Sequence, residues 1–169
     1  MPKVIKTFVR TIDATNKVVG KFSQYLVFVM MGVLLYESIS RTLFNQPHIW
    51  VVEIAQFTMA AYYLLGGGYS MILEGHVRMD LLYGRWSPKT RAIMDMITAV
   101  VLIFYLVLLL YGAISSLEYA LQYGQVNYTS WAPPLAPIKI IMTIGIVLML
   151  LQAIAFFFKD LATARGESL

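Results

Sequence analysis

Residues 92–121 read AIMDMITAVVLIFYLVLLLYGAISSLEYAL, a run in which Asp95 and Glu118 are the only charged side chains. About 20 apolar residues in a helix cross the hydrocarbon core of a bilayer, so this run is longer than an upright span requires. We therefore expect its helix to tilt or to continue past the membrane surface. The run is apolar throughout rather than at alternate positions, which favours a helix over a strand of a membrane barrel.

Three further segments share this apolar character. The chain has 169 residues, is 59% hydrophobic and 13% charged, and has a mean hydropathy of +0.70, well above ordinary soluble domains. The predicted fold is an all-α membrane protein, one domain over residues 1–169 with four transmembrane helices at about 22–44, 49–73, 92–121 and 138–158. These spans leave no length for a separate soluble domain.

The distribution of positive charge predicts the orientation of the spans. Lys and Arg occur in the N-terminal segment, in the loop after the second span and in the C-terminal tail, whereas residues 45–48 and 122–132 contain neither. Short loops that carry Lys and Arg stay on the cytoplasmic side, so both termini should be cytoplasmic. The net charge of +4 then reflects topology, and we expect no nucleic acid as a partner.

The residues before the first span form an amphipathic pattern. Apolar side chains recur there at helical spacing, and basic side chains occupy the other faces: Val4, Ile5, Phe8, Val9 and Ile12 against Lys3, Lys6, Arg10 and Lys17. The pattern predicts an interfacial helix over residues 1–21, with its apolar face in the lipid bilayer. The alternative is a frayed basic leader. No small-residue cleavage site closes the following apolar run, so we expect the first helix to be retained.

Ionisable residues near the outer ends of the spans are candidates for structural ion pairing or for a subunit interface. Glu37 and Arg41 lie four apart on one helix face, and Glu53 and Glu118 are expected at a similar depth. Whether Arg41 pairs with Glu37 or with Glu53 stays open. Such groups are usually paired in a membrane, so Arg41→Ala should cost a few kcal/mol; a proton or ion relay is the alternative.

Other candidate contact residues come from small, aromatic and polar positions. Gly67 lies in a triple glycine and predicts close helix packing, with a bend as the alternative. His76 and Asp80 lie four apart and could share a hydrogen bond, but two ligands support a metal site only weakly. Trp50 is at a position where an aromatic ring can anchor the second span at the membrane interface. Ser130 and Trp131 fall in an outer loop whose conformation is restricted by prolines. Lys139 is expected to reach outward from the start of the fourth span.

Several chemistries lack the residues they need. The sequence has no nucleophile–base pair, phosphate-binding glycine loop or metal-ligand set, and no cysteine, so we expect neither an enzyme nor a cofactor. His48 and His76 lie at span ends rather than inside a bundle, which argues against haem ligation. Repeated halves with midplane polar groups, typical of a stand-alone transporter, are not visible. An accessory role is favoured.

These residues give the chain a resemblance to a known family. Arg41 before the sequence WVVE at residues 50–53, the glycines at 66–68, the stretch 76–80 and the pair Ser130-Trp131 resemble the small, DctQ-like membrane subunit of tripartite ATP-independent periplasmic transporters. The resemblance implies a bacterial inner-membrane scaffold subunit. Its partners would be a large multi-helix membrane transport subunit, which carries the substrate and sodium sites, and a periplasmic substrate-binding protein. The implied activity is sodium-coupled uptake of a solute, of the organic acid class.

Two other functions compete with this one. A small homo-oligomeric, proton-coupled exporter would use Glu37 as its proton-exchanging carboxylate. A purely structural membrane assembly factor is the third possibility. Glu37→Gln separates the exporter from the scaffold, because only the exporter should lose a pH-dependent function.

Overall fold

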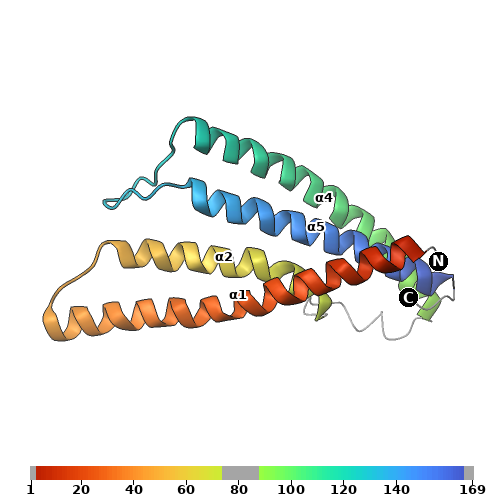
Figure 1. Ribbon diagram of the computed structural model, residues 1–169, viewed down its shortest axis with the longest axis horizontal. Helices are drawn as coiled ribbons and strands as arrows, with labels where there is room; N and C mark the ends of the chain where they lie inside the picture. Colours follow the sequence, from red (N-terminus) through yellow and green to blue (C-terminus); the bar gives the residue numbers. More distant parts are fainter. Residues whose placement is uncertain (1–2, 74–87, 166–169) are drawn as a thin grey trace.

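A computed structural model describes residues 3–73 and 88–165 of the chain. Within these residues it has four helices: α1 (Lys3–Phe44), α2 (Trp50–Ile72), α4 (Pro88–Gln122) and α5 (Ala136–Ala164) (Figure 1). Within these ranges no strand forms; one isolated bridge joins Val126 and Pro134 in the connection between α4 and α5. The predicted all-helical fold class is confirmed, and the helices extend one or more residues past most of the expected span limits.

Local sequence explains where the helices begin and end. Asn45 follows α1 with a φ of 53°, the left-handed conformation that commonly terminates a helix and that Asn tolerates. Pro88 opens α4, and Pro137 lies in the first turn of α5. Proline is favoured in a first turn because its missing N–H has no partner there in any case.

The four helices form a row rather than a bundle around one core. α1 packs on α2, α2 packs on α5 and α5 packs on α4, with a further contact between α1 and α5. The hairpins α1–α2 and α4–α5 approach each other where Lys3 and Ala164 lie, here called the terminal end (Figure 1). They diverge toward the connections 45–49 and 123–135, here called the loop end.

Three of the helices in the described part of the chain, α1, α4 and α5, are long and apolar enough to cross a membrane. α2 has 23 residues, about 35 Å of helix, which is long enough to span, but glutamate, glutamine, tyrosine and glycine residues interrupt its apolar sequence. Its neighbours are α1 and α5, so much of its surface faces protein. Large hydrophobic side chains are exposed along α1 and α4, among them Phe22, Phe28, Phe104 and Leu108. These faces fit a lipid or protein environment better than water.

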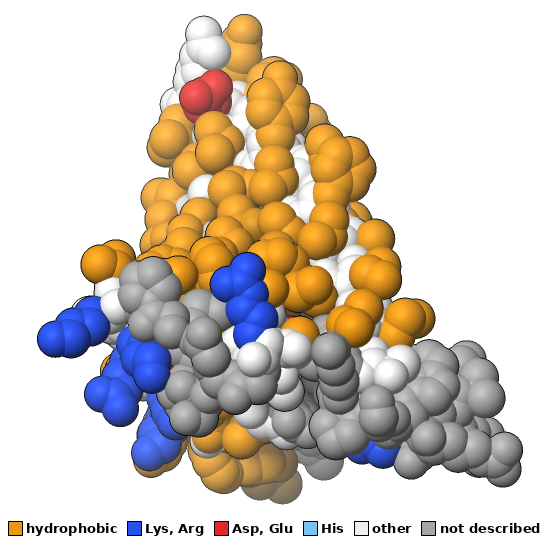
Figure 2. Space-filling model, turned by 90° about the vertical axis from the view of Figure 1, so that its right-hand side faces the viewer, with side chains coloured by type: hydrophobic (Ala, Val, Ile, Leu, Met, Phe, Trp, Pro, Cys, Tyr) orange, Lys and Arg blue, Asp and Glu red, His pale blue; other side chains and the backbone are white. Residues whose placement is uncertain are grey.

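α1 runs without a break through the predicted interfacial segment and the predicted first span, a single helix of 42 residues. The segment before residue 22 also packs on protein, because Val9 is only 4% exposed and Asn16 is fully buried, although Val4 is 77% exposed. Figure 2, viewed from the terminal end, shows Lys and Arg side chains gathered there and hydrophobic side chains covering the described surface behind them.

Candidate functional site: polar contacts at the two ends of the helix row

At the loop end, Glu37 organises the turn between α1 and α2. The backbone N–H of His48 lies 3.2 Å from each carboxylate oxygen of Glu37, and His48 Nδ1 lies 3.1 Å from Oε2. Arg41 Nη2 is 3.4 Å from Glu37 Oε1, across one helical turn, and the Arg41 side chain is 66% exposed. Ser40 Oγ donates to the carbonyl of Gln46 at 3.2 Å and closes the same turn. Glu37 therefore bonds within its own hairpin.

Aromatic rings cover this turn. The ring centroids of Tyr36 and His48 are 5.3 Å apart, those of Tyr36 and Trp50 are 6.2 Å apart, and those of His48 and Trp50 are 5.9 Å apart. Such spacings are typical of interacting aromatic pairs. Trp50, which the sequence suggested as an interfacial anchor, is half-buried in this group.

The other carboxylates of the expected outer cluster lie elsewhere. Glu53 is 4% exposed, and among the described residues its Oε2 has no hydrogen-bond partner. Arg41 pairs with Glu37, which answers the question that the sequence left open. Glu118 is exposed on α4, a helix that packs on α5. The sequence predicted a similar depth for these residues, but depth does not determine which face of its helix each residue occupies.

The three consecutive glycines of α2 have three different surroundings. A Cβ on Gly68 would come within 2.5 Å of Asn16 Oδ1 on α1, and a Cβ on Gly67 would come within 2.6 Å of the Met149 sulfur on α5. A Cβ on Gly66 would meet nothing within 4 Å. Gly67 and Gly68 thus allow close approach of two neighbouring helices of the same chain.

The most extensive polar contact is one that the sequence analysis did not single out, a network that joins α1 to α5 near the terminal end. Lys159 Nζ lies 2.7 Å from Asp13 Oδ2, and Gln152 Nε2 donates to Asp13 Oδ1 at 2.8 Å. Asn16 Nδ2 donates to Gln152 Oε1 at 2.7 Å and lies 3.4 Å from the carbonyl of Leu148. Asn16 and Gln152 are both fully buried. We call these four side chains the α1–α5 network.

The charged end of the network fixes the direction of its hydrogen bonds. The Asp13 carboxylate can only accept, so the amide nitrogen of Gln152 must face it and the Gln152 oxygen must face Asn16. Asn16 then turns its nitrogen toward Gln152 and its oxygen toward Gly68, and this buried oxygen has no partner among the described residues. One interhelical hydrogen bond in a membrane contributes roughly 0.6 kcal/mol, so the four contacts together stabilise the junction by about 2 kcal/mol.

The remaining candidate residues fall on connections. Ser130 and Trp131 are exposed in the connection between α4 and α5. Lys139, which was expected to reach outward from the start of the fourth span, donates from Nζ to Gln125 Oε1 at 2.6 Å, in the connection after α4, and to the Ser116 carbonyl at 3.1 Å. The Gln125 amide oxygen and the Ser116 carbonyl give the half-buried Lys139 ammonium polar partners within the protein. His76 and Asp80 lie outside the described residues.

Two sequence features could have indicated the network. Gln152 is an amide within a strongly apolar run, and Asn16 interrupts the apolar spacing of the N-terminal segment. Buried polar side chains are almost always hydrogen-bonded, so each implied a partner. The sequence does not say which one, because Asn16 and Gln152 are 136 residues apart.

Within the described ranges, no group of three or more His, Cys, Asp or Glu residues is placed to hold a metal ion. The hydrogen bonds and ion pairs described above stay within one hairpin or join α1 to α5. Fold and contacts together define a small, all-helical membrane protein whose polar groups hold helices to one another.

The chain belongs to the family described as "Tripartite ATP-independent periplasmic transporters, DctQ component", whose sequence profile matches residues 30–163. This confirms the family resemblance seen in the sequence. The family is a transport subunit rather than an enzyme, and it works with DctM and DctP partners. No curated protein matched the chain. The matched range includes Glu37, Gly68, Gln152 and Lys159, but it excludes Asp13 and Asn16, the α1 half of the network.

Proposed function

We propose that this chain is the small scaffold subunit of a sodium-coupled secondary transporter in a bacterial inner membrane. Its partners are a large multi-helix membrane subunit and a periplasmic binding protein that delivers the solute, of the organic acid class. Membership of the DctQ component family supports this assignment. The observation that carries the scaffold role is the α1–α5 network, because buried polar groups that hydrogen-bond to one another hold helices in place.

We further propose four spans with both termini in the cytoplasm. α2 is the one described helix outside the three that are apolar enough by composition to cross, and its position between α1 and α5 explains how it can cross, since polar side chains in a membrane face protein. Lys and Arg are concentrated at the terminal end and absent from 45–48 and 122–132, as the positive-inside tendency requires.

In this mechanism the chain forms a fixed wall in the bilayer against which the mobile part of the large subunit slides. The exposed apolar faces of α1 and α4 supply surface for the large subunit and for lipid. The basic, N-terminal part of α1 lies toward the cytoplasmic interface and limits the tilt of the wall. Glu37 and Arg41 fix the α1–α2 turn, and Ser130 and Trp131 lie on the connection that faces the periplasm.

Reconstitution tests this function. Vesicles would contain the chain alone, the large subunit alone, or both, with the binding protein and a sodium gradient supplied in each case. We expect solute uptake only with both subunits, and co-purification of the large subunit from native membranes in near-equal amount. Uptake by the chain alone would overturn the scaffold role. Uptake by the large subunit alone would favour an assembly factor.

Glu37→Gln distinguishes the scaffold from the proton-coupled exporter. Gln keeps an acceptor for the His48 N–H but cannot exchange a proton at the carboxylate, so we expect uptake by the complex and its pH profile to be unchanged. Loss of a pH-dependent step in this variant would support the exporter.

A further inference from the structure

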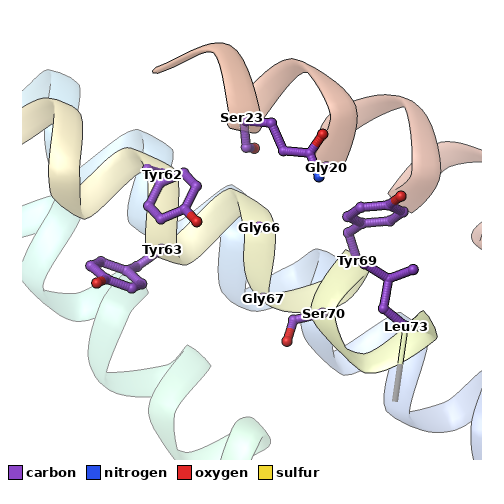
Figure 3. Close-up of a pocket in the computed structure, with 10 residues that line it drawn as sticks. Gly20, Ser23, Tyr62, Tyr63, Gly66, Gly67, Tyr69, Ser70 and Leu73 are labelled. Atoms are coloured by element: carbon purple, nitrogen blue, oxygen red, sulfur yellow. The ribbon is translucent and has the colours of Figure 1, made fainter. Parts of the chain in front are cut away.

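A groove between α1 and α2 has no role in the scaffold function. Its volume is about 390 Å³, and its walls include Gly20 and Gln24 from α1 and Tyr62, Gly66 and Leu73 from α2. Figure 3 shows Tyr62 and Tyr63 at one end, the ring of Tyr69 against α1 at Gly20 toward the other end, and Gly66 and Gly67 between them. Because a Cβ on Gly66 would meet nothing within 4 Å, the middle of the groove is open.

The length of the groove matches one leaflet of a bilayer. Tyr62 and Leu73 are separated by 11 residues of α2, which is about 16 Å along the helix axis. Half of the hydrocarbon core is about 15 Å. With the membrane surface placed at the end of α2, which Leu73 directly follows, the groove runs from that surface to about the midplane.

A single extended acyl chain is much thinner than a helix, which is about 10 Å across with its side chains. Such a chain can lie along the open middle of the groove, where a Cβ on Gly66 would meet nothing within 4 Å.

Positive charge lies at the surface end of the same helix face. Lys17, Gly20, Lys21 and Gln24 follow one another at i, i+3, i+4 and i+7 on α1, so they form one stripe. Gly20 and Gln24 line the groove, and Lys17 and Lys21 are exposed beside them. Basic side chains next to the cytoplasmic leaflet attract anionic headgroups.

We propose that this groove binds one anionic phospholipid, with an acyl chain along Gly66 and the headgroup phosphate against Lys17 and Lys21. The lipid fills the gap between α1 and α2 in the cytoplasmic leaflet and extends the contact between them beyond Gly20 and Tyr69. The proposal depends on a membrane location with the terminal end at the cytoplasmic side, and not on transport activity.

Native mass spectrometry of the full chain in mild detergent, titrated with phosphatidylglycerol, tests the proposal. Gly66→Leu fills the groove, and Gly112→Leu is its matched control, because Gly112 on α4 also faces open space. We expect one tightly retained lipid in the wild type, about tenfold weaker retention in Gly66→Leu and no change in Gly112→Leu. Equal retention in all three would overturn the proposal.

The headgroup site has its own controls. Lys17→Gln with Lys21→Gln should weaken phosphatidylglycerol retention about tenfold. Lys3→Gln with Arg10→Gln removes the same charge from exposed positions on the same helix and should change retention little. Retention of phosphatidylcholine as tight as that of phosphatidylglycerol would overturn the proposed headgroup contact.

A photo-crosslinker in place of Tyr63 identifies the occupant in native membranes, because Tyr63 lines the groove and is 62% exposed. A phospholipid adduct is the expected product. An adduct with a helix of another membrane subunit would replace the lipid with a protein contact and overturn the proposal. Neither result depends on sodium-driven uptake, so the lipid site and the transporter function can fail separately.

Discussion

The two ends of the helix row are held together in different ways. At the terminal end, Asp13 and Asn16 on α1 bond to Gln152 and Lys159 on α5, so the contacts join the two hairpins. At the loop end, Glu37 bonds to Arg41 and His48, and these contacts stay within one hairpin. Residues that join hairpins should therefore matter for the whole fold, and residues within one hairpin should matter locally.

Gln152→Leu should have the largest effect, because it removes the partner of the fully buried Asn16 amide and of one oxygen of the half-buried Asp13 carboxylate. We expect a loss of about 2 to 3 kcal/mol in the free energy of unfolding. Denaturant titration in mixed micelles measures it. Gln56→Leu on the exposed side of α2 is the matched control and should be nearly neutral. Equal effects in the two variants would contradict a stabilising α1–α5 network.

Gly68→Ala should come next, at about 1 to 2 kcal/mol, because the new Cβ would press on Asn16 Oδ1, whose position the network fixes. The control is Gly66→Ala, two residues earlier on the same helix, where the added methyl meets open space. There the higher helix propensity of Ala should be neutral or stabilising. The same micelle titration compares the pair, and a larger cost at Gly66 would show that the α1–α2 contact lies elsewhere.

Lys139→Met should have a smaller and local effect, about 1 kcal/mol, because it removes the bonds to Gln125 and to the Ser116 carbonyl but keeps most of the aliphatic side chain. Limited proteolysis should show faster cleavage within 123–135. Cleavage within the α1–α2 connection should not change. An equal increase at both connections would indicate that the hairpins are coupled at the loop end.

Arg41→Ala should have the smallest effect, below about 0.5 kcal/mol, since Arg41 is 66% exposed and the pair with Glu37 is an ordinary i,i+4 ion pair. This corrects the few kcal/mol expected from the sequence, which assumed that removing Arg41 would leave buried carboxylates unpaired. Thermal unfolding of the purified variant measures the change. A loss comparable to that of Gln152→Leu would mean that Arg41 has a buried partner in the assembled complex.

The fold class could be predicted because long apolar runs have few alternatives to helices in a bilayer. The continuity of α1 could not be predicted. The sequence changes from amphipathic to apolar near residue 22, and such a change resembles the boundary between two separate helices. Lys and Arg are good helix formers, so nothing in the backbone stops the helix there. At Gly20, just before this change of character, the absence of a side chain lets Tyr69 of α2 pack directly against α1.

Some candidate contacts could be predicted from the sequence and others could not. Sequence spacing predicts contacts within one helix, and the Glu37–Arg41 pair could be predicted in that way. Contacts between helices need the rotation of each helix about its axis, which spacing does not supply. Glu118 was therefore grouped by depth with residues that it does not approach, and Asn16 and Gln152 were overlooked although they meet.

The continuity of α1 also has a mechanical consequence. α1 also packs on α2, and one unbroken helix joins the α1–α5 network at Asn16 to the turn at Glu37, about 32 Å further along the helix axis. A helix without a break transmits displacement along its axis, so the two ends of the row cannot slide independently of each other. A longitudinal shift of α1 at the network would therefore reach the Glu37 turn undiminished.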